Sequence, residues 1–231
     1  MNLSDAQPAR AFAQQFGVKM VCYGKPGSGK TPVCVKTAPR PFLLACEPGM
    51  LTLRDCNVPT YPAFNSGKVS EFFDWWFGSH EAKQFDTLVW DSSSEACEMH
   101  IREGFKGKSK AGNDAHGMKI YGNMARDMYE QFSRLYFQPN KHIVLIAKME
   151  RLDLSGTIYH RPWYPGQQLP TQVPHLYDLV TCLGKWNVPG VGETTAFRTA
   201  ETFDYQGRDR SGRLGEYEPP DVSKLIAKCM S

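Results

Sequence analysis

The sequence predicts an α/β fold with a mostly parallel central sheet and helices on both faces of that sheet. Several short runs are apolar along their whole length, and segments with helical periodicity separate some of them. Continuously apolar strands are typical of a parallel sheet that is covered on both sides. The predicted strands are residues 18–23, 42–46, 85–90, 141–147 and 176–183.

Helices are predicted in three of the intervening segments. A short helix is expected at 30–37, directly after a glycine-rich segment, and an amphipathic helix is expected at 67–78. In 118–137, apolar side chains recur every four residues and would form one stripe along a helix. These side chains are Ile120, Met124, Met128, Phe132 and Tyr136.

The chain is predicted to form a single domain of residues 18–231, preceded by an N-terminal extension of residues 1–17. No internal repeat or low-complexity tract divides it, and a chain of 231 residues can bury one sizeable core. Proline and glycine become frequent after about residue 150. Residues 195–218 have the composition of short strands and turns, so an antiparallel edge of the sheet is expected there.

Composition excludes several classes of protein. The net charge of +3 does not by itself mark a nucleic-acid-binding protein. The seven cysteines include no C-x-x-C pair, which argues against a zinc site or a disulfide framework. No apolar run approaches the ~20 residues that a transmembrane helix needs, and the first residues lack the apolar core of a signal peptide. We therefore expect a cytoplasmic protein without a membrane partner.

The most specific motif is YGKPGSGKTP at residues 23–32, which follows the first predicted strand. Gly24, Gly29, Lys30 and Thr31 spell the pattern G-x-x-x-x-G-K-T. Glycines allow positive φ angles that direct successive N–H groups toward one point, and the following helix adds its positive end. In this pattern the lysine reaches the β and γ phosphates and the threonine hydroxyl binds Mg²⁺. The sequence therefore predicts ATP and Mg²⁺ as cofactors, held by Gly24, Lys25, Pro26, Gly27, Ser28, Gly29, Lys30 and Thr31.

Two carboxylates follow other predicted strands. Asp91 is placed to hold Mg²⁺ together with Thr31. An aspartate after a strand is also a common helix cap, a role that residues 92–94, all serine, would fill equally well. Glu47 is a candidate general base for the water that attacks the γ-phosphate. The alternative for Glu47 is a solvated turn residue before Pro48.

In this order, the segments resemble the RecA-like ATPase core, and most closely the small phage recombination ATPases of the Sak single-strand-annealing type. GKPGSGKT is similar to the family's phosphate loop, and the resemblance covers about residues 18–230. It implies a RecA-like core that hydrolyses ATP, with Glu47 in FLLACEPGMLTL as the catalytic base and Asp91 in LVWDSS beside the magnesium ion. NKHIVLIAKMER resembles the strand whose end senses the γ-phosphate. This places Lys148 where the family usually has Gln or His.

The resemblance also places two mobile DNA-binding loops, at about 104–117 and 152–166. Residues 102–119 carry five Lys or Arg against two acidic residues, a net charge of +3 that equals that of the whole chain. A flexible basic loop suits contacts with the phosphate backbone, and aromatic rings beside a cation suit stacking on unpaired bases. The candidate DNA ligands are Lys106, Lys108, Lys110, Arg161 and Trp163. As alternatives, the lysines are merely solvated and the tryptophan packs under a proline turn.

The segment YQGRDRSGRL resembles a basic segment that lies beside a neighbouring subunit's nucleotide in the family. Arg208 and Arg210 are therefore candidate arginine fingers that act across an interface. A salt-bridged surface turn is the alternative. The resemblance implies a homo-oligomer, either a ring or a filament, with single-stranded DNA as its partner in the cytosol of a bacterial host. It leaves open whether a single-strand-binding protein takes part.

The predicted function is thus a DNA-stimulated ATPase that binds single-stranded DNA and promotes annealing or strand exchange. Two alternatives remain open. One is a small-molecule or nucleotide kinase on the same core, for which residues 102–119 would form a lid over the acceptor. The other is a nucleotide-gated adaptor that binds ATP with little turnover. Phosphorylated products would identify the kinase, and DNA-stimulated turnover would identify the recombination ATPase.

Overall fold

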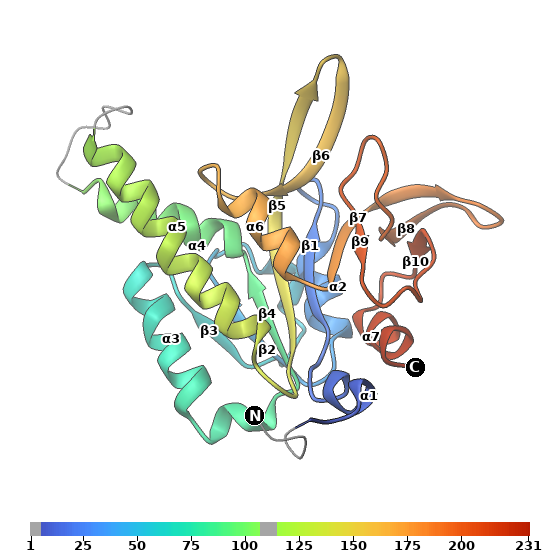
Figure 1. The fold of residues 1–231 in the computed structure, drawn as a ribbon, viewed down its shortest axis with the longest axis horizontal. Coiled ribbons are helices and arrows are strands. Elements are labelled where there is room, and N and C mark those ends of the chain that lie inside the picture. The colour runs from blue at the N-terminus through green and yellow to red at the C-terminus, as the bar shows by residue number, and fades with distance from the viewer. Residues whose placement is uncertain (1–5, 107–114) are drawn as a thin grey trace.

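A computed structural model of the chain describes residues 6–106 and 115–231. In this part of the chain a ten-stranded sheet forms the centre of the molecule (Figure 1). Its strand order is β10-β8-β7-β1-β5-β4-β2-β3, and β6 and β9 pair with β5 and β7 off this path. The order is not sequential, and helices lie in most of the connections between successive parallel strands along the chain.

The strands from β7 to β3 in this order run parallel, and their carboxyl ends lie at one edge of the sheet. Tyr23 is level with Ala147 and Cys182, and Ala45 is level with Asp91. We call this the carboxyl edge and the opposite one the amino edge. The parallel strands are β1 (Lys19–Tyr23), β2 (Pro41–Ala45), β3 (Thr60–Pro62), β4 (Thr87–Asp91), β5 (His142–Leu154) and β7 (Leu179–Val188).

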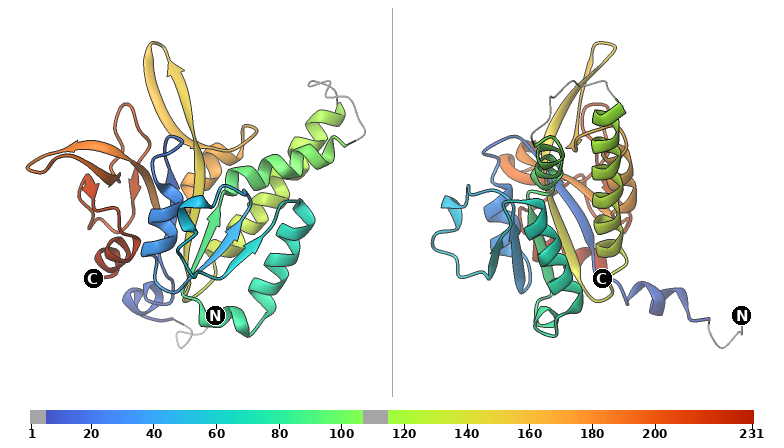
Figure 2. Two further views of the ribbon diagram at one scale, coloured as in Figure 1. Left: turned by 180° about the vertical axis from the view of Figure 1, so that it is seen from behind. Right: turned by 90° about the vertical axis from the view of Figure 1, so that its left-hand side faces the viewer.

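Helices cover both faces of the sheet, as the side view in Figure 2 shows. Successive residues of β1 enter opposite cores: Val21 and Tyr23 pack on one face, and Met20 and Cys22 on the other. The first face is covered by α3 (Ser66–Gly78), α4 (Ser93–Gly104), α5 (Ala115–Tyr136) and α6 (Leu169–Leu176). The second face is covered by α2 (Lys30–Thr37) and α7 (Val222–Met230).

An antiparallel half completes the sheet beyond β7. It contains β8 (Gly192–Arg198), β9 (Arg208–Asp209) and β10 (Tyr217–Glu218). β6 (Thr157–Trp163) pairs antiparallel with the second half of β5, and this hairpin projects beyond the carboxyl edge (Figure 1). The remaining elements are α1 (Ala9–Ala13) and 3-10 helices at Leu51–Leu53 and Glu81–Gln84.

The predicted fold class is confirmed, including the antiparallel C-terminal edge. The predicted helix at 30–37 has the observed bounds, and those at 67–78 and 118–137 agree within three residues at each end. In contrast, β5 and β7 extend well past the predicted residues 147 and 183. Their second halves belong to hairpins that are open to solvent, so they lack the continuous apolar run from which strands were predicted.

The segment predicted as a mobile loop at 152–166 is instead largely a β-hairpin. Seven residue pairs join β5 and β6, from Lys148↔Trp163 to Leu154↔Thr157. The helix α6 was also not predicted, because Pro170 and Pro174 lie within it. Proline is tolerated in the first turn of a helix, and Pro170 occupies that position.

No helix in the described ranges is long and apolar enough to cross a membrane.

Candidate functional site

The phosphate loop connects the carboxyl end of β1 to the first turn of α2. Gly27 and Gly29 have φ angles of 75° and 89°, which side chains disfavour. Gly24 is constrained by space instead, because a Cβ atom there would overlap the carbonyl oxygen of Leu183 in β7. The helix begins at Lys30 without a side-chain cap. Its first N–H groups therefore remain available to an anion at the positive end of the helix dipole.

Lys30 folds back over this loop. Its Nζ atom donates hydrogen bonds to the carbonyl oxygens of Gly24, at 2.9 Å, and of Lys25, at 3.0 Å. These acceptors hold the ammonium group against the loop. Phosphate oxygens are stronger acceptors for an ammonium group than neutral carbonyls, because both partners are then charged. Lys30 is thus placed to exchange its carbonyl partners for a phosphate group.

Thr31 and Asp91 meet directly, as the predicted magnesium site requires. The Thr31 hydroxyl donates a hydrogen bond to Oδ2 of Asp91, which is 5% exposed. Burial raises the pKa of Asp91 to about 6; Glu47 adds to this rise, while Thr31 and Lys30 oppose it. One hydroxyl and one carboxylate are hard oxygen donors, and Mg²⁺ is usually bound by one or two carboxylates together with substrate phosphates and water. The residues present therefore fit a magnesium ion.

Glu47 lies beside this pair, at the carboxyl end of the neighbouring strand. The backbone N–H of Cys46 donates to the carbonyl oxygen of Asp91 at 2.6 Å, which fixes the two strand ends together. The Ser92 hydroxyl donates to Oε1 of Glu47 at 2.7 Å. The carboxylate is half-buried, so it is positioned by the fold but remains open on one side. This arrangement suits a base that orients a water molecule.

The Ser92 hydroxyl has two structural roles at this site. Its Oγ atom accepts a hydrogen bond from the N–H of Glu95 at 3.1 Å, so it is the N-cap of α4. The same hydroxyl positions Glu47. Ser92 therefore provides the cap that Asp91 was considered for, and Asp91 faces Thr31. Sequence reasoning identified Ser92 only as a possible cap, since the link to Glu47 depends on the pairing of β2 with β4.

Lys148 lies in β5, one residue beyond the stretch that pairs with β1. Its Nζ atom is 2.7 Å from Oε2 of Glu95, and it also contacts the carboxylate of Glu98. It lies 5.7 Å from the centre of the Trp163 ring. Partial burial opposes a higher pKa at Lys148, but the two carboxylates outweigh it and raise the pKa. Lys148 thus joins α4 to the β5–β6 hairpin; its role as a sensor stays a prediction.

The candidate DNA ligands fall in three different settings. Arg161 is paired with Glu150 across the hairpin, with Nε 2.7 Å from Oε2. Trp163 is half-buried beneath Lys148, and its carbonyl accepts from the Ser94 hydroxyl at 2.6 Å. Lys106 is exposed just after α4. Lys108 and Lys110 lie outside the described residues.

Arg208 and Arg210 are bound to the C-terminal end of α6 in their own chain. Arg208 donates to the carbonyl oxygens of Pro174 and His175, at 3.0 and 2.9 Å. Arg210 donates to the carbonyl oxygens of Leu176 and His175, at 3.0 and 2.6 Å. Cations at a helix C-terminus satisfy the last carbonyls and the negative end of the helix dipole. The site thus contains neither arginine in this chain, and their action on a neighbouring subunit stays a prediction.

One family model and one solved structure are similar to this chain. Residues 17–210 match a family described as "AAA domain". Among solved structures, the chain is similar to a KaiC-like protein from the hyperthermophilic archaeon Pyrococcus horikoshii OT3, with 13% sequence identity and a TM-score of 0.44. That similarity covers 79% of this chain and 77% of the other. No curated protein matches the chain.

Proposed function

The chain belongs to the AAA-domain family, a family of nucleotide-binding ATPase domains, and we propose that within this family it is a phage-type recombination ATPase. In this proposal it binds single-stranded DNA and promotes annealing or strand exchange. The observation that carries the ATPase part is the convergence of Lys30, Thr31, Asp91 and Glu47 at the carboxyl edge. Lys30 and Thr31 begin α2, Asp91 ends β4, and Glu47 follows the neighbouring strand β2.

The binding step follows from the contacts of the phosphate loop. The loop N–H groups and Lys30 would bind the phosphates of ATP, and Lys30 would leave its two carbonyl partners. Thr31 and Asp91 would hold Mg²⁺, whose charge offsets that of the phosphates. Three or four charge-assisted hydrogen bonds at ~1.5–3 kcal/mol each would supply much of the ~8 kcal/mol of micromolar binding.

The hydrolytic step is assigned to Glu47. Its carboxylate would accept a hydrogen bond from a water molecule and orient it toward the γ-phosphate. Ser92 keeps one carboxylate oxygen occupied, with its hydroxyl 2.7 Å away. In this proposal the other carboxylate oxygen accepts from the water molecule.

A chain of side chains leads from Glu47 to the β5–β6 hairpin and supports coupling between ATP and DNA. Ser92 contacts Glu47 and caps α4 at Glu95, and Glu95 pairs with Lys148. Lys148 lies against Trp163 at the base of the hairpin. A change at Glu47 on ATP binding would therefore reach two candidate DNA-binding elements, the hairpin and α4 with the segment that follows it. The resemblance to phage annealing ATPases supports this assignment.

The proposal is tested by measuring phosphate release with and without single-stranded DNA, together with a gel shift at low salt. We expect single-stranded DNA to raise the turnover of the wild type several-fold. Lys30→Ala should abolish nucleotide binding and turnover. Lys36→Ala, on the exposed side of the same helix, is the matched control and should behave as the wild type. If single-stranded DNA does not change the rate of phosphate release and no DNA is shifted in the gel, the DNA-binding part of the proposal is abandoned. The ATPase part is unaffected by that result.

The proposed assembly is a homo-oligomer, in which Arg208 and Arg210 would act on the nucleotide of the adjacent subunit. A single-strand-binding protein is a candidate partner in this setting. Addition of such a protein to the turnover assay would show whether DNA covered by it still stimulates ATP hydrolysis.

A further inference from the structure

Phe203 is an exposed aromatic residue on a well-supported turn. Its side chain is 82% exposed between β8 and β9. The turn around it is held by its own hydrogen bonds: Thr202 N–H donates to the Tyr205 carbonyl at 3.0 Å, and Tyr205 N–H donates to the Thr202 hydroxyl at 3.2 Å. The backbone is therefore fixed, while the phenyl ring remains largely in solvent. A rigidly presented aromatic side chain is the usual form of an interface anchor.

Two acidic residues belong to the same turn. Glu201 and Asp204 flank Phe203 in the sequence, and Glu201 accepts from the Tyr159 hydroxyl at 2.5 Å. Arg198 lies 3.6 Å from Asp204 but is shared with Glu216, 3.4 Å away. We refer to residues 201–205 as the Phe203 turn. Arg198 is shared by Asp204 and Glu216, so the surroundings of the turn keep a net negative charge. An apolar anchor in an acidic setting suits a groove that is both apolar and basic.

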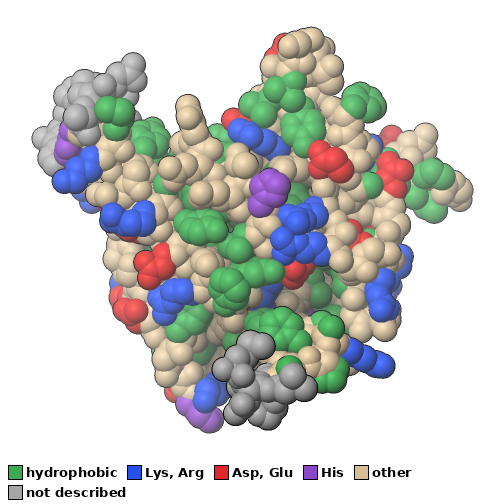
Figure 3. Space-filling model, viewed as in Figure 1, with side chains coloured by type: hydrophobic (Ala, Val, Ile, Leu, Met, Phe, Trp, Pro, Cys, Tyr) green, Lys and Arg blue, Asp and Glu red, His purple; other side chains and the backbone are tan. Residues whose placement is uncertain are grey.

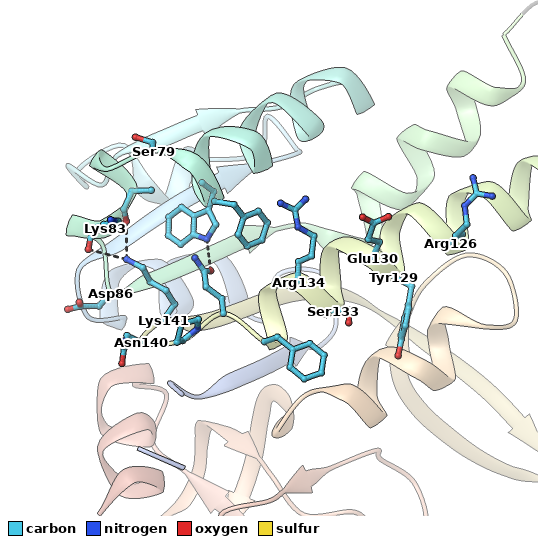
Figure 4. A pocket seen from close by; sticks show the side chains of 16 residues that line it. Ser79, Lys83, Asp86, Arg126, Tyr129, Glu130, Ser133, Arg134, Asn140 and Lys141 are labelled. Atoms are coloured by element: carbon cyan, nitrogen blue, oxygen red, sulfur yellow. Dashed lines mark hydrogen bonds between the residues drawn. The ribbon is translucent and has the colours of Figure 1, made fainter. Parts of the chain in front are cut away.

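A groove of this kind lies at the amino edge of the sheet, on both sides of Phe137. A cavity of about 1120 Å³ separates the end of α3 from α5 (Figure 4). A cavity of about 730 Å³ lies between α1, α7 and the end of α5. Phe137 lines both and is 63% exposed, and Phe12 and Met230 line the second at 53% and 50% exposure. We call the two cavities together the amino-edge groove.

Hydrophobic side chains gather at this groove, over the C-terminal end of α5 and beside α1 (Figure 3). In the described ranges, four exposed cations line it without a carboxylate at ion-pair distance: Arg10, Lys83, Arg134 and Arg213. Lys19 and Lys141 also line it, but both are buried. Arg134 points from α5 toward α3, with its guanidinium 4.0 Å from the centre of the Phe77 ring (Figure 4). Asp86, Asp178 and Glu130 also line the groove, the first two paired with Arg40 and Arg210, so the lining carries more cations than carboxylates.

The turn and the groove cannot meet within one chain. The Phe203 turn lies beside β6, since His160 N–H donates to the Asp204 carbonyl at 2.8 Å, and β6 belongs to the hairpin beyond the carboxyl edge. The groove lies at the opposite edge, where Lys19 and Lys141 begin the central strands. An anchor and a complementary groove at opposite ends of a molecule define a head-to-tail contact.

We propose that the Phe203 turn of one copy docks in the amino-edge groove of a second copy. The ring would bury its surface against Phe137 and its neighbours, and the two carboxylates would face the unpaired cations. Because the two surfaces differ, the contact repeats along a ring or filament rather than closing a two-fold dimer. This proposal rests on the oligomer in the proposed function and specifies its contact surfaces. Its test measures assembly and requires neither DNA nor ATP turnover.

The test uses Phe203→Asp and Phe137→Asp in sedimentation velocity. Both side chains are largely exposed, so both variants should remain folded. We expect the wild type to assemble at low salt and each variant alone to be monomeric, with at least a 100-fold weaker association. An equimolar mixture should form a heterodimer, because one variant keeps its groove and the other keeps its turn. Met118→Asp, at a site 66% exposed elsewhere on α5, is the control and should assemble as the wild type.

Several outcomes would overturn the proposal. Assembly of either single variant like the wild type would contradict the contact. A mixture of the two variants that stays monomeric would contradict it as well. A wild type that is monomeric at all concentrations and low salt would also refute self-docking and would direct attention to a different protein as the occupant. Binding of a fluorescent ATP analogue to the monomeric variants, expected unchanged, separates loss of assembly from loss of the nucleotide site.

Discussion

Thr31 and Asp91 are 60 residues apart in the chain, yet one hydrogen bond joins their side chains. Thr31 follows β1 through the phosphate loop, Asp91 ends β4, and β5 lies between these two strands in the sheet. Their contact places a hydroxyl and a carboxylate where a magnesium ion would bridge to a phosphate. The charges of the buried Asp91 and the half-buried Glu47 are therefore the ones on which the proposed magnesium binding and water activation depend.

Glu47→Gln should leave nucleotide binding intact and lower turnover at least 100-fold. The amide keeps the size of the side chain and its contact with the Ser92 hydroxyl, but it cannot act as a base for the attacking water. Single-turnover phosphate release and binding of a fluorescent ATP analogue measure the two effects separately. Glu150→Gln, on the β5–β6 hairpin, controls for a general loss of negative charge. Unchanged turnover in Glu47→Gln would remove the base assignment.

The buried carboxylate of Asp91 should make stability without nucleotide depend on pH. Burial raises its pKa from 3.8 to about 6, so the folded chain binds the proton more tightly than the unfolded chain. The stabilisation that this proton provides is complete below pH ~4 and is lost as pH rises through about 6. The difference corresponds to ~3 kcal/mol at most.

Urea unfolding of the wild type and of Asp91→Asn across this pH range checks the effect. The difference in unfolding free energy between the two proteins should shift in favour of the variant as the pH rises from 4 to 7. A difference that stays constant with pH would show that Asp91 is ionised in the folded chain throughout. Magnesium with ATP should reduce the pH dependence, because a bound cation favours the ionised carboxylate.

At the scale of elements, α4 and the β5–β6 hairpin are joined at their bases. Lys148 pairs with two carboxylates of α4 and lies against Trp163 of the hairpin. The Ser94 hydroxyl adds a second link, because it accepts from the Lys148 N–H at 3.0 Å and donates to the Trp163 carbonyl. The hairpin is therefore tied to the helix that begins at the magnesium side of the site.

Lys148→Met should reduce the ratio of DNA-stimulated to basal turnover toward one. The methionine keeps much of the side-chain length but leaves Glu95 and Glu98 without this cation, so α4 and the hairpin are no longer linked by charge. Lys68→Met is the matched control, because it removes an ion pair of the same kind, with Nζ 2.7 Å from Oε2 of Glu71, on α3 and outside both candidate DNA-binding elements. An equal loss of stimulation in both variants would contradict a specific coupling through Lys148.

At the scale of the whole molecule, the two edges of the sheet have different tasks. The carboxyl edge carries the phosphate loop and Glu47, whereas the amino edge carries the groove beside Phe137. Arg210 also lines this groove, so a head-to-tail contact would bring a candidate finger toward the adjacent copy. The two arginines bind the end of α6 in the single chain, so their loss should affect stability as well as turnover.

Mixing experiments separate these two effects of the arginines. Arg208→Ala combined with Arg210→Ala keeps the phosphate loop, and Lys30→Ala keeps both arginines. If the arginines act in trans, a mixture of the two inactive proteins should regain turnover, up to about a quarter of the wild type when the copies mix at random. A mixture as inactive as its components, while thermal unfolding shows both proteins to be folded, would restrict the arginines to capping α6.

Much of the fold was predictable because the parallel strands are buried on both faces. The runs at 18–23 and 85–90 are apolar throughout, and the stripe in 118–137 follows the period of a helix. The hairpin of β5 with β6 was not predictable in this way. Most of its residues are partly buried or exposed and show no regular alternation, so their pairing depends on a strand register that no local pattern expresses.

The sequence by itself determined the phosphate loop, since glycine conformation, the following helix and the lysine are all encoded within eight consecutive residues. Only the tertiary structure decided which acidic and polar side chains join that loop. Ser92 rather than Asp91 caps α4, Glu47 is held by Ser92, and the arginines at 208 and 210 bind the end of α6. These contacts join residues far apart in the chain, and they arise from the order and register of strands, which are set by packing of the whole sheet.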